Sequence, residues 1–447
     1  VERAAFLEEL EAVDLEWVAA RFAQYRAEAS GRKPSPVLSP APVLGLPRTA
    51  EEREREAEAR AVGEAALRAG RLAAFVVAGG QGTRLGFDGP KGLFPFGPVT
   101  GRTLFRIHAE QIRARARRYG APIPWYIMTS PENNAATRSY FEARGFLGFD
   151  EKDVRFFAQA TVPALDFEGR LLLAGKGRLA RNPDGHGGSL EAPVRSGAIA
   201  EMRARGVDTI SYFQVDNPLV AICDPVFAGH HIAAGADFSS KAVEKRGPGE
   251  KVGVFCLRDG RPAVVEYSDL DEAPKNERDA SGRLRFWAGS IAVHLLSVDF
   301  VERMARVAEL PWHVARKAVP ALDRDGRLRA PDAPNSLKFE RFVFDAMDFA
   351  GKSVAVEARR EEEFAPLKNA AGDDSPETAR RLASERAARL LEASGVRVPR
   401  GPDGRALSAI ELSSLFALDA EELRARVDPA LRVGTTLVLE EEAGGAP

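Results

Sequence analysis

An unbroken apolar run that leads directly into a glycine-rich turn constrains this chain more than any other feature. Residues 72–77 read LAAFVV, and a short run of this kind is typical of a parallel strand that is buried on both faces. Gly79, Gly80, Gly82 and Gly86 follow. Glycine permits backbone conformations and close approaches that a Cβ forbids, which leaves amide groups free to face oxyanions. The stretch therefore predicts a phosphate-binding loop at the end of a buried strand.

Two cations follow this turn and narrow the choice of ligand. Arg84 offers a planar fork for bidentate phosphate contact, and Lys91 offers a compact ammonium on a flexible stem. The glycines are spaced GxGxxxG rather than the GxGxxG of dinucleotide sites, and Lys91 is followed by glycine rather than by the Ser or Thr of a P-loop. A nicotinamide-dependent oxidoreductase is therefore disfavoured. We interpret the stretch as a cradle for a nucleoside triphosphate.

The complete motif is more specific than its glycines. Residues 79–86 read GGQGTRLG, and Pro90-Lys91 follow. This resembles the sugar-nucleotide pyrophosphorylases, whose signature is GGxGTRL with a later PK. The chain is further similar, in order and across most of its length, to the eukaryotic-type UDP-N-acetylhexosamine pyrophosphorylases. The similar segments read VDN, VVEYS, KFERFVFD and EFAPLKN, at residues 215–217, 264–268, 338–345 and 363–369.

The length and the order of elements predict a multidomain α/β protein. A chain of 447 residues is too long for one ordinary core. Strand-like runs alternate with helix-like stretches such as 103–118 and 190–205, which predicts a doubly wound, mostly parallel sheet; the resemblance implies a Rossmann-like, GT-A-like nucleotidyltransferase. The strand-like runs are 72–77, 124–129, 154–157, 209–215, 252–257, 264–267 and 291–295. We expect an N-terminal helical segment (1–70), a catalytic domain (71–370) and a small C-terminal domain (371–447) with a disordered tail. A Pro-containing break at 33–48 should interrupt the first segment before a helix that begins from Thr49. Residues 373–376, DDSP, should cap a charged helix that runs to about residue 393.

Charge and composition limit the partners. With 63 basic and 65 acidic residues the chain has a net charge of -2, which gives no overall attraction to nucleic acid or anionic membranes. The basic cluster RARARR at 113–118 lacks interleaved aromatic residues, so we expect the solvent-facing side of a helix. No apolar run approaches the ~20 residues of a membrane span, and no leader opens the chain. We expect a cytoplasmic monomer or weak homo-oligomer that binds neither nucleic acid nor membrane.

Polar residues at the ends of other strand-like runs complete the candidate site. Asp216 follows the run 209–215, and a carboxylate there suits Mg²⁺ (or Mn²⁺), which takes one or two carboxylates together with phosphate oxygens. The alternative is that Asp216 caps the turn before Pro218. Gln159 follows the run 154–157, and its amide offers both a donor and an acceptor to a pyrimidine edge. A second glycine-rich turn, NPDGHGG at 182–188, is unspecific by itself.

The resemblance implies roles for these and further residues. For the nucleotide it implies contacts from Val77, Ala78, Gly79, Gly80, Gln81, Gly82, Thr83, Gln159, Gly185 and Asp216, the last also as the metal ligand. For the sugar it implies His186, Glu266, Tyr267 and Ser290. As catalytic cations it implies Arg84, Lys91, Lys338 and Lys368.

Two departures from the family pattern lie on the sugar side. His186 stands where the N-acetylhexosamine enzymes commonly carry Asn, and Ser290 ends an Ala-Gly-Ser sequence where they read AGN. Both changes remove an amide that would touch the sugar. Because hexose-using relatives often carry His at the first position, glucose 1-phosphate or a broad set of sugar phosphates stays open as the second substrate.

The resemblance implies a uridylyltransferase, in which a sugar 1-phosphate oxygen attacks the α-phosphorus of UTP in line and pyrophosphate leaves. Both reactants are anions, so alignment and charge neutralisation replace a covalent nucleophile. The expected product is UDP-N-acetylglucosamine or UDP-N-acetylgalactosamine. A non-catalytic sensor of nucleotide sugars is the alternative from another class, and it predicts binding without turnover.

Overall fold

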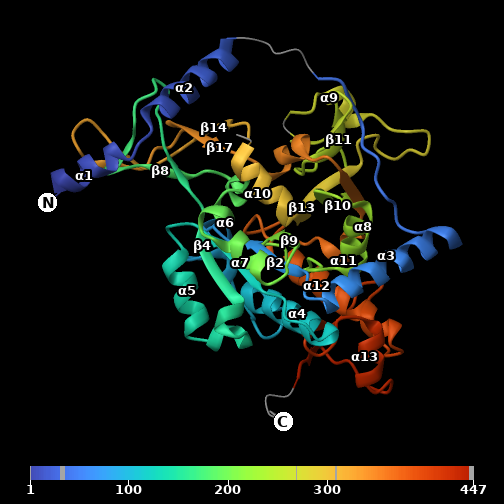
Figure 1. Ribbon diagram of the computed structural model, residues 1–447. Helices are drawn as coiled ribbons and strands as arrows, with labels where there is room; N and C mark the ends of the chain where they lie inside the picture. Colours follow the sequence, from blue (N-terminus) through green and yellow to red (C-terminus); the bar gives the residue numbers. More distant parts are fainter. Residues whose placement is uncertain (1, 31–35, 268, 308–309, 442–447) are drawn as a thin grey trace.

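A mixed ten-stranded sheet forms the centre of the computed structural model, which describes residues 2–30, 36–267, 269–307 and 310–441 (Figure 1). Four parallel strands form one half of this sheet in the order β4-β3-β2-β9. Their bounds are β2 (Leu72–Val77), β3 (Trp125–Thr129), β4 (Val154–Ala158) and β9 (Thr209–Gln214). These bounds confirm the strands expected from the apolar runs in this half.

The register of the parallel half brings the carboxyl ends of its strands together. Val77 at the end of β2 lies beside Met128 of β3 and Gln214 of β9, and Met128 lies beside Phe157 of β4. The loops that follow these strands therefore meet along one edge of the sheet, which is where ligands bind in open α/β folds.

The other half of the sheet is largely antiparallel and is organised around the long strand β13 (Ala288–Ser297). β13 pairs with β9 at one end, with β11 (Val254–Arg258) at the other, and with β10 (Phe238–Glu244) along its length. β12 (Arg261–Val265), β18 (Ser353–Glu357) and β1 (Leu38–Pro40) complete this half. The predicted doubly wound α/β fold is confirmed. All strands are parallel in the half that carries the glycine turn, whereas the other half, over its described residues, has one parallel pair, β10 with β18.

Helices cover both faces of the sheet. In β2, Ala74 and Val76 point into one hydrophobic cluster, whereas Phe75 and Val77 point into the other. The first face is covered by α3 (Ala50–Arg68), α4 (Leu104–Tyr119), α5 (Asn134–Glu142), α8 (Pro225–Ala234) and α12 (Pro376–Ala393). The second face is covered by α6 (Ala192–Arg195), α7 (Ala198–Ala204) and α10 (Val298–Val307). The single helix expected over 190–205 is wrong, because Gly197 adopts the left-handed conformation (φ 79°) between α6 and α7.

The N-terminal residues form helices before and after the expected Pro-containing break. α1 (Glu2–Glu11) and α2 (Leu15–Ser30) pack near β14 (His313–Lys317) and β17 (Ser336–Glu340), where Trp17 lies 5.0 Å from Trp312 between ring centroids. Residues 38–40, expected as a break, instead form the edge strand β1 on β11, a position that tolerates Pro40. The helix expected from Thr49 is confirmed as α3, with a capping box between Thr49 and Glu52.

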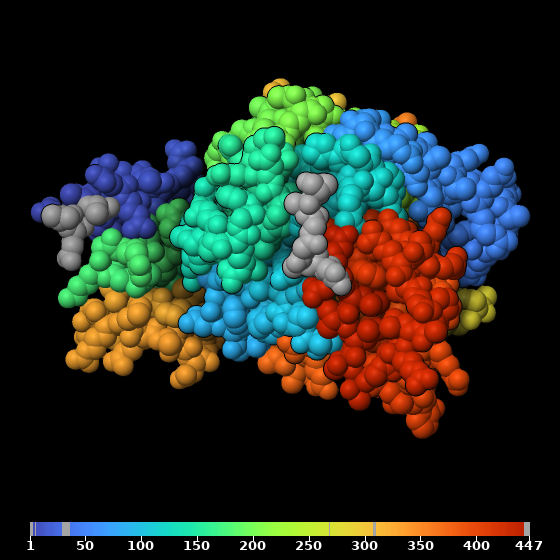
Figure 2. Space-filling view, turned by 90° about the horizontal axis from the view of Figure 1, so that it is seen from below, coloured from blue at the N-terminus to red at the C-terminus, as the bar shows by residue number. Residues whose placement is uncertain are grey.

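The C-terminal residues form their own hydrophobic cluster around α12 and are docked on α4. The remaining elements there are β19 (Ala409–Leu412), α13 (Ala420–Arg426) and β20 (Thr436–Leu439). Arg118 of α4 forms ion pairs of 2.6 Å with both Asp419 and Glu422, and Figure 2 shows the two regions in contact. The expected solvent-facing basic cluster is therefore wrong in part, because these arginines join two regions of the chain. The domain boundary at 370 stays a prediction, and most of the expected disordered tail, 442–447, lies outside the described residues.

Shorter elements complete the fold. They are β5 (Thr161–Pro163), β6 (Leu173–Gly175), β7 (Arg178–Leu179), β8 (Arg181–Pro183), α9 (Glu272–Asn276), β15 (Ala321–Leu322), β16 (Leu328–Arg329) and α11 (Arg360–Glu363). Within the described ranges, no helix is long and apolar enough to cross a lipid bilayer.

Candidate active site

The glycine turn after β2 folds back on itself and leaves backbone amides without partners. Gly82 N donates to Gly89 O at 2.8 Å, and Lys91 N donates to Gly80 O at 3.0 Å, which closes the turn. The amides of Gly79, Gly80 and Gln81 donate no hydrogen bond to any described residue. Gly80 is exposed, so these donors are available to an anion, as expected from the sequence.

Two side chains from neighbouring strand ends support this turn. Asn133 Nδ2 donates to Ala78 O at 2.9 Å, while Ser130 N donates to Asn133 Oδ1 at 2.9 Å. Gln159 lies directly against the turn, since a Cβ added to Gly79 would stand 2.6 Å from Gln159 Oε1. The structure thus brings the predicted uracil-reading amide to the cradle. It also explains Gly79, because a side chain there would displace Gln159.

Lys91 and Asp216 meet at the tip of β9. Lys91 Nζ lies 3.2 Å from Asp216 Oδ2 and donates to Leu367 O at 3.2 Å, while Leu367 N donates to Asp216 O at 2.9 Å. Asp216 therefore contacts a predicted catalytic cation rather than only capping a turn. Arg84 is exposed in the short 3-10 turn Thr83–Leu85 and forms no ion pair within the described chain; its phosphate role stays a prediction.

Asp216 is the carboxylate that could hold a metal here. No group of three or more His, Cys, Asp or Glu side chains suited to a metal occurs among the residues that the structure describes. A lone carboxylate fits a Mg²⁺ ion that brings phosphate oxygens with it, because Mg²⁺ sites at nucleotides use one or two carboxylates plus phosphates. The donor set therefore suits a nucleotide-borne ion and not an independent protein metal site.

Three of the four predicted sugar residues, Glu266, Tyr267 and Ser290, lie on or directly after strands of the antiparallel half. Glu266 is near Lys368. Ser290 N donates to Gly253 O at 2.7 Å, and a Cβ on Gly253 would stand 3.6 Å from Glu266 Oε1. Burial raises the pKa of Glu266, and nearby Asp269 adds to this effect while Lys368 opposes it. Lys368 adjoins Leu367, the residue bound by Lys91, so the two halves of the site are contiguous. Tyr267 follows Glu266 and is partly buried; Ser268 of the VVEYS segment lies outside the described residues.

His186 is fixed by its surroundings. Val343 N donates to His186 Nδ1 at 3.0 Å, and the imidazole stacks on Phe342 with centroids 5.2 Å apart. Burial lowers the pKa of His186 to about 4, with His313 adding to the effect. The ring is therefore neutral, and its hydrogen is on Nε2 because Nδ1 accepts. Where an asparagine would offer both a donor and an acceptor, His186 offers one N–H.

The second glycine turn, 182–188, and residues 341–344 form what we call the sugar wall. Several residues that hold this wall together were not predicted from the sequence. Arg341 Nη2 bonds to Asp184 Oδ2 at 2.6 Å, and Gly187 N donates to Arg341 O at 2.8 Å, which fastens the second glycine turn to 341–344. A Cβ on Gly185 would stand 2.4 Å from Arg341 O. His313 stacks on the other side of Phe342 at 4.5 Å. Only the adjacency of Asp184 to Gly185 and of Arg341 to Phe342 in the quoted segments could have signalled these roles.

Among the described residues, no ion pair or hydrogen bond links Lys338 to Arg84, Lys91 or Lys368. Its Nζ donates to Glu340 Oε1 at 2.6 Å, and both side chains are about equally shielded on β17. The structure therefore pairs this lysine within its own strand. Its role at the phosphates stays a prediction.

The comparisons with known proteins agree with this geometry. Residues 48–393 match the family model described as UTP–glucose-1-phosphate uridylyltransferase. The chain belongs to the UTP–glucose-1-phosphate uridylyltransferase family. The match covers the cradle, Asp216, the sugar-side residues and Lys368.

Within the UTP–glucose-1-phosphate uridylyltransferase family, the chain is similar to proteins named for N-acetylated sugars. It is 43% identical over 321 residues to a Xenopus tropicalis UDP-N-acetylhexosamine pyrophosphorylase-like protein 1, which covers 70% of this chain and 63% of that protein. It is 34% identical to the Saccharomyces cerevisiae UDP-N-acetylglucosamine pyrophosphorylase, which covers 86% of this chain and 82% of that protein. These relatives confirm the resemblance predicted from the motifs.

Solved structures give the same answer for the fold. The UDP-N-acetylglucosamine pyrophosphorylase of Trypanosoma brucei, in complex with inhibitor, matches with a TM-score of 0.83 at 28% identity, covering 99% of this chain and 94% of that one. The putative enzyme of that name from Entamoeba histolytica matches with a TM-score of 0.79 at 27% identity, covering 90% of this chain and 99% of that one.

Proposed function

We propose that this protein is a uridylyltransferase that forms UDP-N-acetylglucosamine or UDP-N-acetylgalactosamine and pyrophosphate from UTP and an N-acetylhexosamine 1-phosphate. The observation that carries the proposal is the contact of Lys91 with Asp216, 3.2 Å apart, beside a turn with unpartnered amides. The names of the relatives and the family model support the same reaction.

In the proposed reaction each part of the site has a role. The free amides of the cradle and Lys91 hold the β- and γ-phosphates, and Arg84 at the rim adds charge to the departing pyrophosphate. Lys368, next to Leu367, draws the sugar phosphate toward the α-phosphorus. Because the two reactants repel each other in water, fixed cations lower the barrier mainly by alignment and by neutralising charge.

Mg²⁺ fits this arrangement through Asp216 and the phosphate oxygens of UTP. When bound, the ion would spread the charge that accumulates on the leaving phosphates. Asp216 itself orients Lys91, because this contact holds the ammonium at the end of β9. Gln159 would read uracil from its position against Gly79.

Glucose 1-phosphate is the second candidate substrate, and the fixed ring of His186 favours it. Because Nδ1 accepts from Val343 N, the neutral imidazole has only its Nε2–H left to donate. It can donate to the carbonyl oxygen of an acetamido group but cannot accept from the N–H of that group. Ser290 likewise offers a hydroxyl instead of an amide. The preference for an N-acetylated sugar therefore depends on Glu266 and on the backbone of the antiparallel half.

Formation of UDP-sugar and pyrophosphate from UTP, Mg²⁺ and N-acetylglucosamine 1-phosphate tests the proposal. We expect turnover that depends on all three components. Binding of UDP-N-acetylglucosamine without any turnover would contradict the proposal and support a sensor of nucleotide sugars.

A further inference from the structure

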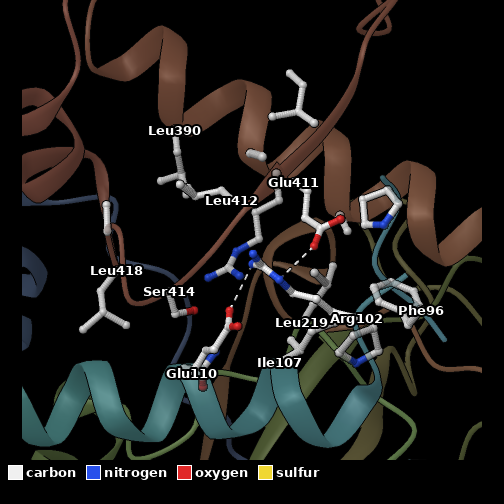
Figure 3. A pocket seen from close by; sticks show the side chains of 18 of the residues that line it. Phe96, Arg102, Ile107, Glu110, Leu219, Leu390, Glu411, Leu412, Ser414 and Leu418 are labelled. Atoms are coloured by element: carbon white, nitrogen blue, oxygen red, sulfur yellow. Dashed lines mark hydrogen bonds and ion pairs between the residues drawn. The ribbon is translucent and has the colours of Figure 1, made fainter. Parts of the chain in front are cut away.

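A cavity of about 90 Å³ lies between the catalytic sheet and the C-terminal residues, away from the cradle. Its walls come from α4, from the loop 218–221, from α12 and from β19 with the residues after it (Figure 3). The loop 218–221 begins two residues after Asp216. The cavity is thus enclosed by four parts of the chain that are separate from one another in sequence.

One arginine in this cavity, Arg102, is paired with carboxylates of the protein. Arg102 forms ion pairs with Glu110 at 3.2 Å and with Glu411 at 3.3 Å, and Figure 3 shows these three side chains turned toward one another. Glu411 also accepts from Thr100 N at 2.8 Å, and Glu110 accepts from Ser413 Oγ at 2.8 Å. The two carboxylates of the cavity are therefore satisfied, and so is Arg102.

Two other arginines that line the cavity each have a buried Nε without a hydrogen bond. Arg115, from the basic cluster of α4, makes neither a hydrogen bond nor an ion pair with any residue in the described part of the chain, and its Nε is buried without a partner. Against the effect of burial, Lys241 and, to a smaller extent, Arg115 lower the pKa of Asp224. Arg386 of α12 has only a distant ion pair, 3.5 Å to Glu362, and its Nε is also buried without a hydrogen bond. Glu362 is in addition bonded to Arg389 at 2.6 Å.

The two guanidinium groups also repel each other. Burial lowers the pKa of Arg386. The carboxylates of Glu362 and Glu363 oppose this effect, whereas the positive charges of Arg115 and Arg389 lower the pKa further. Buried donors without partners are costly, and like charges at one cavity add to the cost. An oxyanion between the guanidinium groups would satisfy both, because arginine forks match phosphate geometry.

We propose that Arg115 and Arg386 form an anion site for inorganic phosphate or pyrophosphate between α4 and the C-terminal residues. The size of the cavity supports a small ion, because pockets for nucleotides and other organic ligands begin near ~300 Å³. Pyrophosphate is a product of the proposed reaction, whereas phosphate is free in solution. The site does not depend on the proposed function, since none of its residues belongs to the cradle or to the sugar wall.

Thermal unfolding and calorimetric titration with phosphate, pyrophosphate and chloride at matched ionic strength test this site on the full chain. Millimolar phosphate or pyrophosphate should raise the Tm by about 1 to 3 °C over chloride. Arg115→Gln and Arg386→Gln should each weaken anion binding about tenfold or more. The matched control is Arg381→Gln on the same helix, because Arg381 is exposed and does not line this cavity, and this variant should bind like the unchanged chain. A tenfold preference for pyrophosphate would identify the product as the occupant, and equal binding would identify free phosphate.

Lys91→Ala separates this site from the cradle, where phosphates also bind. The Tm shift should persist in Lys91→Ala and fall in the arginine variants. If the shift is instead lost in Lys91→Ala and kept in both arginine variants, the anion binds the cradle and the proposal is wrong. Should an Arg→Gln variant fail to fold, Arg115→Lys and Arg386→Lys keep the charge but lose the fork, and undiminished anion binding in both would equally overturn the proposal.

Discussion

The parallel and antiparallel halves of the sheet build different parts of the same site by different means. The cradle on the parallel side is made from contiguous residues, 79–91, and its donors are backbone amides fixed by the turn itself. The sugar wall on the antiparallel side is assembled from side chains that are distant in sequence, such as Asp184 with Arg341 and His186 with Val343. Most substitutions keep a backbone N–H donor, whereas they remove or replace a side-chain donor. We therefore expect the nucleotide to be fixed in this protein and the sugar to be adjustable.

The largest effect should come from the cation of the cradle. Lys91→Ala removes the ammonium between Asp216 and Leu367 O, and losing one preorganised donor costs ~3 kcal/mol of transition-state stabilisation, or about a hundredfold in kcat. Steady-state pyrophosphate release measures this. Lys152→Ala is the control, because Lys152 is exposed and pairs with Asp150. Near-normal kcat in Lys91→Ala would remove the proposed role.

A smaller effect should follow from crowding the uracil reader. In Gly79→Ala the new Cβ would stand 2.6 Å from Gln159 Oε1, so the amide must move. We expect the KM for UTP to rise about tenfold and discrimination against CTP to fall, with the sugar phosphate KM unchanged. Gly175→Ala is the control, because its added Cβ meets no atom within 4 Å. An unchanged UTP-to-CTP ratio would mean that Gln159 does not read the base.

The sugar side should respond to a change that leaves the nucleotide unaffected. His186→Asn restores an amide, and we expect kcat/KM for N-acetylglucosamine 1-phosphate relative to glucose 1-phosphate to rise about tenfold. The KM for UTP should stay the same. A panel of sugar 1-phosphates with the unchanged chain and this variant measures the ratio. If kcat/KM changes equally for both sugar 1-phosphates, His186 does not select the sugar. The proposed difference between the two halves of the sheet would then be wrong at this residue.

The smallest effect should be on the free energy of unfolding at acidic pH. Burial holds the pKa of His186 and of His231 near about 4, below the ~6.5 of an unfolded histidine. Such a histidine contributes its full stability above pH ~6.5, and this is lost as the pH falls toward 4, because the unfolded chain binds the proton first. His186→Asn should therefore reduce the loss of unfolding free energy between pH 7.5 and 6 by ~1 kcal/mol.

Urea unfolding at both pH values measures this change. His231→Asn, whose ring bonds to Ser239 away from the site, should reduce the acid loss similarly but leave sugar selection unchanged. An acid loss in His186→Asn equal to that of the unchanged chain would mean that the ring is not buried neutral.

The sequence was sufficient for the parallel half because its signals are local. The run 72–77 is strand β2, Thr49 and Ser375 cap α3 and α12, and the tips of β4 and β9 place Gln159 and Asp216 at the cradle. Each of these depends on a few neighbouring residues and on the register that parallel strands share.

The antiparallel half was predicted only in part, because some of its elements depend on distant partners. The expected runs 252–257, 264–267 and 291–295 overlap β11, β12 and β13, whereas β10 was not expected. Strand β10 reads FSSKAVE, and a lysine at its centre suggests a solvent-exposed segment. Lys241 is nevertheless fully buried, because Asp224 and Glu363, distant in sequence, both bond to it at 2.6 Å. The same holds for the His313 pair with Asp345, 2.8 Å apart, which supports the ring of Phe342 from the side opposite His186. No pattern of neighbouring residues in the sequence predicts ion pairs between such distant side chains.

The central claim is that fixed cations and amides let one anion attack another without a covalent nucleotidyl intermediate. Rapid-mixing measurement of pyrophosphate, with enzyme equimolar to UTP and Mg²⁺, tests it most directly. Pyrophosphate should be released only when the sugar 1-phosphate is also present. A stoichiometric burst without the sugar 1-phosphate would show that the chain itself takes up the uridylyl group, and the account would be contradicted.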